Sequence, residues 1–238
     1  MSQNKKNYYE ANMAILEKHQ PMIWEQMKKS PVQPIGTVFY TPDDLPNLTI
    51  SSNDDQLITL HKEADPKSES MDLLQKIAED HKGVISVLGM GLGYQVLDVL
   101  KNRPLLQFLA VFELEPGIFL QALTHMDLSE LLGDPRLILC LGEPGNINKV
   151  LAKASRTLQL EDAAIYDHLP SYRYKTEGYT RLKNDLYSHI NSLNVGGATT
   201  RALGKDFMEN RLDHLSTIHH HHLLECLSYR FINTPAII

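Results

Sequence analysis

Short apolar runs alternate with helix-patterned segments along the middle of the chain. Val84–Leu88 is a run of β-branched and aliphatic residues bounded by glycine on both sides, which predicts a buried strand. Val96, Leu97 and Leu100 then recur at helical spacing, and a second apolar run spans residues 108–112. Strand, glycine turn, helix and strand in this order form the first half of a nucleotide-binding α/β unit.

The same alternation continues as far as residue 167. Apolar runs at residues 137–141 and 163–166 predict two further strands, and a helical stripe with Ile147 and Val150 lies between them. Alternating strands and helices favour a mostly parallel sheet. The sequence therefore predicts an α/β fold with a Rossmann-like domain over residues 66–177.

The two flanking regions have different patterns. Residues 5–29 carry two helical stripes, and residues 31–64 hold short apolar runs punctuated by proline, asparagine and aspartate, which is typical of a small antiparallel sheet. We therefore expect a small N-terminal α+β domain at residues 1–65. From Gly178 onward the pattern is helical, which predicts a helical C-terminal segment over residues 178–238.

Composition narrows the function classes. The chain has 238 residues, of which 42% are hydrophobic and 22% charged, as is ordinary for a soluble globular protein. Its net charge of -6 argues against general nucleic-acid binding, which requires neutralisation of phosphates. No apolar run reaches transmembrane length, and the N-terminus lacks the apolar core of a signal peptide. Cys140 and Cys226 lack CxxC spacing, so we expect reduced, buried thiols in a cytoplasmic protein.

The candidate chemistry lies at the carboxyl ends of the predicted strands. Gly89, Gly91 and Gly93 allow the backbone to turn tightly and approach a ligand, and the helix after them offers free N–H groups. Glu113 follows at about the distance, roughly 20 residues, at which an acid accepts hydrogen bonds from ribose hydroxyls. Glu143 ends the next strand. These residues form the predicted cofactor-binding set, although the spacing is GxGxG and not GxGxxG.

Other polar groups give weaker signals. The four consecutive histidines at His219–His222 have only Glu225 nearby as a further donor, so a solvated polar turn or helix face is favoured and no metal site is predicted. The basic-aromatic patch at residues 172–175 fits a sugar phosphate or an acidic partner, but more often such a patch is plain surface. His168 beside Asp167 fits acid-base chemistry, but no nucleophile or metal motif accompanies the pair.

Three stretches, in this order, resemble a known family. VLGMGLGYQ, VFELEPGIFLQAL and LSELLGDPRLILCLGE occupy residues 87–95, 111–123 and 128–143. They are similar to the N-terminal region of the motility-accessory-factor (Maf) glycosyltransferases. The helical stretch that ends in NTPAII, at residues 233–238, also resembles the family's lead-in to its central domain. The resemblance covers most of residues 30–238.

The resemblance implies a bacterial, cytoplasmic enzyme that transfers nonulosonic, sialic-acid-like sugars from a CMP-sugar to Ser or Thr of flagellin. The family's catalytic glycine-proline-serine loop would follow Ile238, so no catalytic residue is assigned to this chain. The chain would be an accessory N-terminal domain for nucleotide-type ligand binding, acceptor docking or oligomerisation, with no cofactor assigned and flagellin as its partner. The stripe of Ile23, Trp24 and Met27 fits a homo-oligomer contact, although a helix docked on the body is favoured.

The competing interpretation is an S-adenosylmethionine-dependent enzyme. The same core resembles class I methyltransferases and their aminopropyltransferase relatives. In that case the backbone of the three glycines would lie alongside the methionine part of the cofactor. Glu113 would then hold the ribose, and Glu143 would face the adenine amine. Methyltransferases usually place an acid two residues before the first glycine, where this sequence has Val87. In a third interpretation the glycines bind no ligand and only allow a strand and a helix to pack closely.

Overall fold

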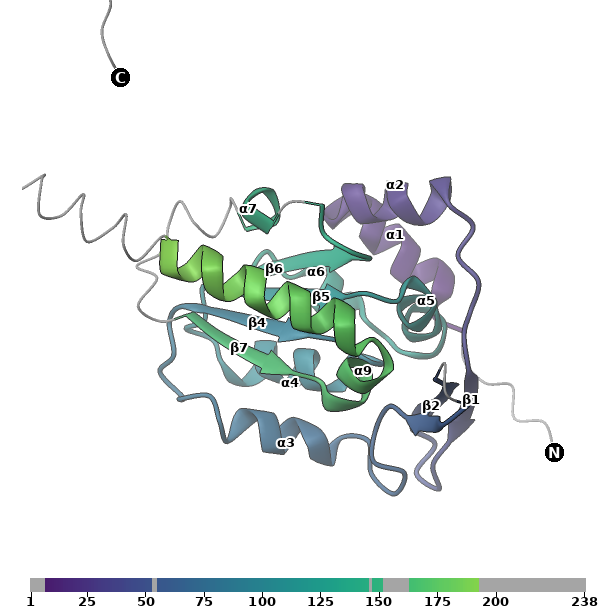
Figure 1. Cartoon of the computed structure of the whole chain (residues 1–238). Coiled ribbons are helices and arrows are strands. Elements are labelled where there is room, and N and C mark those ends of the chain that lie inside the picture. The colour runs from purple at the N-terminus through teal and green to yellow at the C-terminus, as the bar shows by residue number, and fades with distance from the viewer. Residues whose placement is uncertain (1–6, 53–54, 146, 152–162, 193–238) are drawn as a thin grey trace, which may run out of the picture. The chain divides into compact units, whose positions relative to one another are not determined.

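Four parallel strands form the centre of the part of the chain that the structure, a computed structural model, describes: residues 7–52, 55–145, 147–151 and 163–192 (Figure 1). The strands are β4 (Val84–Leu88), β5 (Phe108–Glu113), β6 (Leu137–Leu141) and β7 (Ala163–Asp167). Their order across the sheet is β6-β5-β4-β7. The predicted α/β, Rossmann-like sheet is therefore confirmed.

Strand β4 is buried along its whole length. Alternate side chains of a strand point to opposite faces of the sheet. Accordingly Ile85 and Val87 belong to one hydrophobic cluster, whereas Val84 and Leu88 belong to a second. A parallel strand that is covered on both faces is a continuous apolar run in the sequence, which is why this strand could be predicted.

Helices cover both faces of this sheet (Figure 1). The helices are α3 (Ser68–Leu74), α4 (Tyr94–Asn102), α5 (Pro116–His125), α6 (Ser129–Gly133), α7 (Ile147–Val150) and α9 (Leu169–Tyr174). Residues 176–192 continue as a further helical segment. Helices α3 to α6 contribute to the cluster of Ile85 and Val87, and the segment 176–192 contributes Tyr179, Leu182 and Leu186 to the other cluster.

A small antiparallel sheet precedes the parallel one, as predicted. Its strands are β1 (Thr37–Tyr40), β2 (Pro46–Ser51) and β3 (Leu57–Thr59), in the order β1-β2-β3. Asn47 of β2 is fully buried and holds the chain just after β3: its Nδ2 donates to the His61 carbonyl at 2.9 Å, and its Oδ1 accepts from the His61 amide at 3.1 Å. These two hydrogen bonds fix the position of the His61 backbone.

Two N-terminal helices, α1 (Tyr9–His19) and α2 (Pro21–Lys29), pack on the body of the chain. Ile23 and Met27 are buried in the main cluster, and Trp24 packs against it. The stripe predicted on α2 therefore docks this helix on the body. A homo-oligomer contact stays a prediction.

The chain divides into two compact units, Met1–Asn191 and Ser192–Ile238. The small sheet and the parallel sheet both lie in the first unit, and all but the first residue of the second lie outside the described residues. The predicted division at residues 65 and 178 stays a prediction, and the histidine run His219–His222 cannot be placed because it lies outside the described part.

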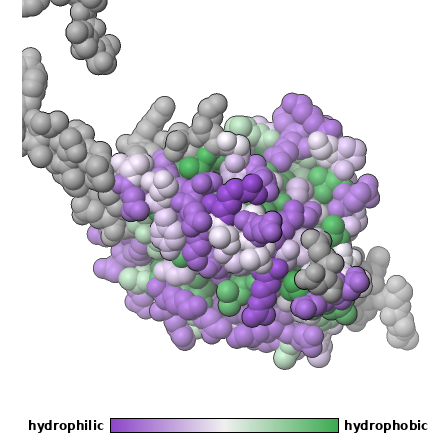
Figure 2. All heavy atoms as spheres, in the orientation of Figure 1, coloured by the Kyte–Doolittle hydropathy of each residue, from purple (hydrophilic) through white to green (hydrophobic). Residues whose placement is uncertain are grey.

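The surface of the described part is mixed in character. The face seen in Figure 2 is mostly hydrophilic, with small, separated hydrophobic patches. Among the described residues, none of the helices combines the length and the apolar character that crossing a membrane requires.

Candidate functional site

The loop from Gly89 to Gly93 connects β4 to α4 at the carboxyl end of the sheet. Gly89, Gly91 and Gly93 have φ angles of +85°, +55° and +99°, in the region that L side chains rarely adopt. The loop conformation thus favours glycine at all three positions. The Gly89 amide donates to the carbonyl of Phe112 at 2.8 Å, which ties the start of the loop to β5.

Glu113, the last residue of β5, is fully buried, and its carboxylate is bonded inside the protein. Oε2 accepts from the Met90 amide at 2.9 Å, and Oε1 accepts from the Glu115 amide at 3.0 Å and the Tyr179 hydroxyl at 3.1 Å. Burial raises the pKa of Glu113 to about 7, although the three donors favour the charged form. The predicted ribose acceptor therefore joins the glycine loop to the helical segment 176–192.

Side chains of the protein itself lie directly against two of the glycines. A methyl group added at Gly89 would overlap the side chain of Ser171. At Gly91 it would lie 2.7 Å from the ring of His61 and 2.9 Å from that of His168. In a dinucleotide-binding site, a glycine at such a position lets the backbone come close to the pyrophosphate of the ligand. Here it accommodates side chains from the segments after β3 and β7.

Glu143 does not join this hydrogen-bonded group. It follows β6, its side chain is 66% exposed, and its Oε1 pairs with Arg181 at 3.1 Å. The structure thus brings the three glycines and Glu113 together and leaves Glu143 at the surface. Binding of a cofactor by any of these residues stays a prediction.

A buried cluster that sequence reasoning missed lies against Gly91. His61 follows β3, Glu69 belongs to α3 and His168 follows β7. These residues offer ligand atoms that all lie within 4.8 Å of one another. The side chains of His61 and His168 are 0% and 1% exposed, and that of Glu69 is 14% exposed. No sequence spacing signals this set, because three separate segments supply it.

Backbone amides fix the tautomer of His61 and bond one carboxylate oxygen of Glu69. The Leu92 amide donates to Nε2 of His61 at 2.9 Å, so the proton of the neutral ring is on Nδ1. Nδ1 in turn donates to Oε2 of Glu69 at 3.2 Å. The other carboxylate oxygen of Glu69 accepts from the Lys62 amide at 2.8 Å. His61 is therefore a donor to Glu69.

His168 has one bonded nitrogen and one without a partner. Nδ1 lies 2.7 Å from the Ser171 hydroxyl, whereas Nε2 has no hydrogen-bond partner among the described residues. That nitrogen lies 3.9 Å from Oε2 of Glu69. Burial and, secondly, the neighbouring His61 lower the pKa of His168 well below its usual value, although the nearby Leu60 backbone carbonyl favours the charged form, so this ring is neutral at pH 7.

The residue pair that the sequence suggested for acid-base chemistry is not paired in the structure. Asp167 accepts from Nζ of Lys183 at 2.6 Å, and His168 turns toward Ser171 and Glu69 instead. Successive residues after a strand point in different directions, which separates the two side chains.

A cavity of about 480 Å³ opens next to Glu69. Gln95, Asp167 and Arg173 are among its lining residues. It lies near the carboxyl ends of β4 and β7, where the strand order reverses, because β5 and β6 continue on one side of β4 and β7 pairs on the other. Ligands of open α/β sheets occupy the crevice at this point.

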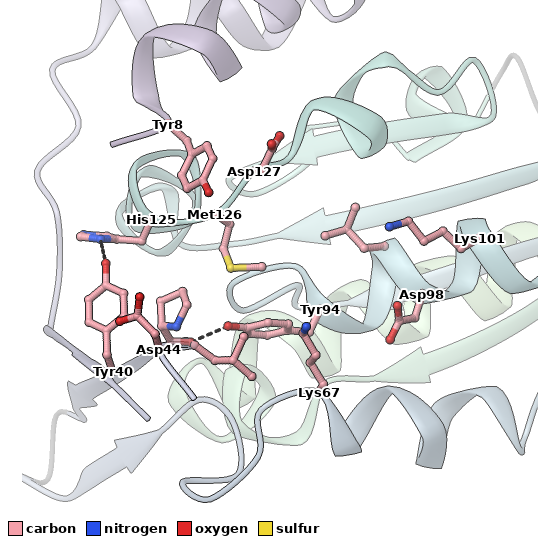
Figure 3. A pocket seen from close by; sticks show the side chains of 13 residues that line it. Tyr8, Tyr40, Asp44, Lys67, Tyr94, Asp98, Lys101, His125, Met126 and Asp127 are labelled. Carbon is pink, nitrogen blue, oxygen red and sulfur yellow. Dashed lines mark hydrogen bonds between the residues drawn. The ribbon is translucent and has the colours of Figure 1, made fainter. Parts of the chain in front are cut away.

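A second cavity, of about 400 Å³, lies between the small sheet, α4 and α5 (Figure 3). Tyr8, Tyr40 and Tyr94 give it aromatic walls, and aspartates and lysines surround them. The Tyr40 hydroxyl lies 2.9 Å from Nδ1 of His125, and the Tyr94 hydroxyl donates to the Pro46 carbonyl at 2.8 Å. Aromatic faces with a few polar groups suit a small polar molecule. No sequence motif predicted this cavity.

Comparison with known proteins gives distant structural likenesses to solved structures. No protein-family model matches the chain, and no curated protein matches it. The structure of MAf glycosyltransferase from Magnetospirillum magneticum AMB-1 is similar at 15% identity and a TM-score of 0.48, over 71% of this chain and 34% of that chain. The chain thus spans about a third of the length of that protein. At this identity and TM-score, the likeness by itself assigns neither a family nor an activity.

Proposed function

We propose that this chain is the accessory N-terminal part of a Maf-family glycosyltransferase and that its Rossmann-like sheet is a scaffold without a nucleotide cofactor. The family assignment is supported by the ordered sequence stretches at residues 87–95, 111–123 and 128–143. Flagellin is the proposed acceptor protein and a nonulosonic sugar the transferred group. The catalytic loop would belong to another part of the enzyme, and this part would dock the acceptor.

The observation that carries the scaffold proposal is the internal bonding of Glu113. An acid that binds ribose must keep its oxygens available to the hydroxyl donors of the ligand. Both oxygens of Glu113 already accept hydrogen bonds, from the amides of Met90 and Glu115 and the hydroxyl of Tyr179, and the residue is fully buried. A ribose in their place would leave these buried donors unpaired, at a cost of about 1–3 kcal/mol each.

The contacts of the glycines support the same proposal. Ser171 packs against Gly89, and the rings of His61 and His168 pack against Gly91. The positive φ angles and the missing side chains are thereby explained by packing within the protein, without a ligand.

A thermal-shift panel tests the scaffold proposal. The ligands are S-adenosylmethionine, S-adenosylhomocysteine, NAD, CMP and CMP-sialic acid, with the wild type and the isosteric variant Glu113→Gln. A ligand at about 100 times its Kd stabilises the native state by about 2.7 kcal/mol, which raises Tm by several degrees. We expect no shift with any of the five. An adenosyl-ligand shift that Glu113→Gln abolishes would contradict the proposal and favour the methyltransferase interpretation.

The docking role needs a separate measurement. Flagellin is titrated against the immobilised full chain by surface plasmon resonance, with an unrelated acidic protein as the control analyte. Saturable binding of flagellin alone is expected. If flagellin binds no better than the control, the docking role is wrong, whereas the ligand panel still decides the scaffold proposal.

A further inference from the structure

We propose that Glu69 and His168 bind one divalent transition-metal ion, preferably Zn²⁺, and that His61 holds Glu69 in place from outside the coordination sphere. The starting observation is the unpartnered Nε2 of His168, which is buried and lies 3.9 Å from Oε2 of Glu69. The proposal does not rest on the proposed function, because it concerns a different group of residues from Glu113 and its donors.

His168 has the surroundings of a metal ligand. A ligating histidine almost always bonds its second ring nitrogen to a fixed polar partner, which sets the tautomer. Ser171 supplies that partner at 2.7 Å from Nδ1. Nδ1 of His168 and the Ser171 hydroxyl can each donate in this hydrogen bond. In the tautomer that donates the Nδ1 proton to Ser171, the lone pair of Nε2 faces Glu69. A buried nitrogen without a hydrogen-bond partner is unfavourable, and an ion bound there would supply the missing partner.

His61 is assigned to the outer shell because of Leu92. If Nδ1 of His61 bound the ion, Nε2 would have to carry the ring proton. The N–H group at Nε2 would then point at the N–H group of Leu92, whose nitrogen lies 2.9 Å from Nε2. Two hydrogen-bond donors would face each other, which is unfavourable. The favourable arrangement keeps the proton on Nδ1, from which it is donated to Oε2 of Glu69. Ligating carboxylates are commonly hydrogen-bonded in this way.

The distances require only a small adjustment. Zn–N and Zn–O bonds of about 2.0–2.1 Å place two ligands of a tetrahedral ion about 3.3 Å apart. The two ligand atoms are 3.9 Å apart, so they would close by about 0.6 Å, less than a bond length. Of the two ligands, Glu69 is the less enclosed, because it borders the cavity of about 480 Å³ and its side chain is 14% exposed.

The same cavity provides the entry path and the remaining ligands. Two protein ligands leave coordination positions for water, and Glu69 and Gln95 line the opening from which water can reach them. One imidazole nitrogen and one carboxylate oxygen suit Zn²⁺, whereas Mg²⁺ prefers oxygen ligands alone.

The test is isothermal titration calorimetry of Zn²⁺ into the full chain, from which the histidine run and Cys226 are removed. The starting protein carries Asn in place of each histidine of His219–His222 and Ser in place of Cys226, because imidazole and thiolate groups are Zn²⁺ ligands that can bind the ion adventitiously. We expect one saturable Zn²⁺ site and no comparable Mg²⁺ binding. Glu69→Gln and His168→Ala should abolish the site, and His61→Asn should weaken it about 10–100-fold.

Two variants guard against an indirect effect. Glu69→Gln keeps the size of the side chain and an acceptor oxygen for His61, and its fold is checked by circular dichroism. His81→Ala removes another histidine with an unpartnered Nε2 that does not belong to the cluster, so it should leave Zn²⁺ binding unchanged. The proposal is wrong if the starting protein binds no Zn²⁺, if folded Glu69→Gln binds it as before, or if His81→Ala abolishes binding. Complete loss in His61→Asn would overturn the outer-shell role.

Discussion

Glu113 is a buried acid on which two opposing effects act. Burial disfavours the charged form, whereas two amides and a hydroxyl donate hydrogen bonds that favour it. Burial is the larger effect and raises the pKa from 4.5 to about 7. The native protein therefore holds this proton more tightly than the unfolded chain does, and protonation stabilises the fold.

The first prediction concerns the pH dependence of stability. As pH rises from about 4.5 to about 7, the unfolded chain loses the Glu113 proton before the native state does, so the free energy of unfolding falls. Glu113→Gln has no such proton. Between about pH 5 and about pH 8, its free energy of unfolding should rise relative to the wild type by about 2–3 kcal/mol. Urea unfolding of both proteins at the two pH values measures this difference, and parallel pH profiles would contradict it.

The second prediction concerns the glycine loop. Gly91→Ala should destabilise the protein by about 2 kcal/mol or more, because φ is +55° and the new methyl group would lie 2.7 Å from His61. Gly145→Ala is the matched control, since no atom lies within 4 Å of an added methyl group there, and its effect should stay within about 0.5 kcal/mol. Thermal unfolding compares the two, and equal effects would show that the loop tolerates a side chain.

At the scale of elements, Arg103 joins two helices. It is the C-cap residue of α4, and its guanidinium donates to the carbonyls of Leu74 at 2.6 Å and Ile77 at 2.7 Å, at and just beyond the end of α3. The last carbonyls of a helix have no donor within the helix. A planar group with several donors can satisfy two of them at once, which a lysine ammonium on a flexible stem cannot do equally well.

The third prediction follows from this contact between α3 and α4. Arg103→Lys keeps the charge but should cost about 2–4 kcal/mol, because Arg103 is only 8% exposed and the carbonyls of Leu74 and Ile77 would lose its hydrogen bonds. Arg181→Lys changes an arginine whose side chain is 63% exposed and should cost less than about 0.5 kcal/mol. Denaturant midpoints of both variants give the comparison. A similar loss in both would mean that Arg103 contributes nothing beyond a surface charge.

At the scale of the whole molecule, burial of β6 controls the reactivity of Cys140. The sequence predicted a reduced, buried thiol, and the structure confirms the burial of Cys140, which is 9% exposed. Cys226 lies outside the described residues. Burial raises the pKa of the Cys140 thiol to about 11, so the nucleophilic thiolate is scarce at neutral pH.

The fourth prediction uses this thiol to report unfolding. In a Cys226→Ser variant, Cys140 should react with a disulfide reagent about 100-fold more slowly in the native protein than in the denatured chain. The reaction in denaturant is the control. Rapid reaction under native conditions would mean that the strand opens locally without global unfolding.

Strand–loop–helix order was predictable because its signals are local. Val84–Leu88 is covered on both faces, and such burial leaves a continuous apolar run in the sequence. Gly89, Gly91 and Gly93 adopt φ angles that favour glycine, so the turn could also be anticipated. The hydrogen bond from Tyr179 to Glu113 could not be anticipated, because Tyr179 lies 66 positions further along the chain. The same holds for His61, whose proximity to His168 depends on how the small sheet meets the parallel one.

The sequence by itself determined the α/β fold, the parallel strands and the place of the glycine loop, because apolar periodicity and backbone preference act between near neighbours in the chain. Only the tertiary structure decided what the loop contacts. The two oxygens of Glu113 are bonded within the protein, and His61, Glu69 and His168 meet beside Gly91. The physical reason is that a buried polar group takes the nearest partner in space, and strand order and helix packing decide which residue that is.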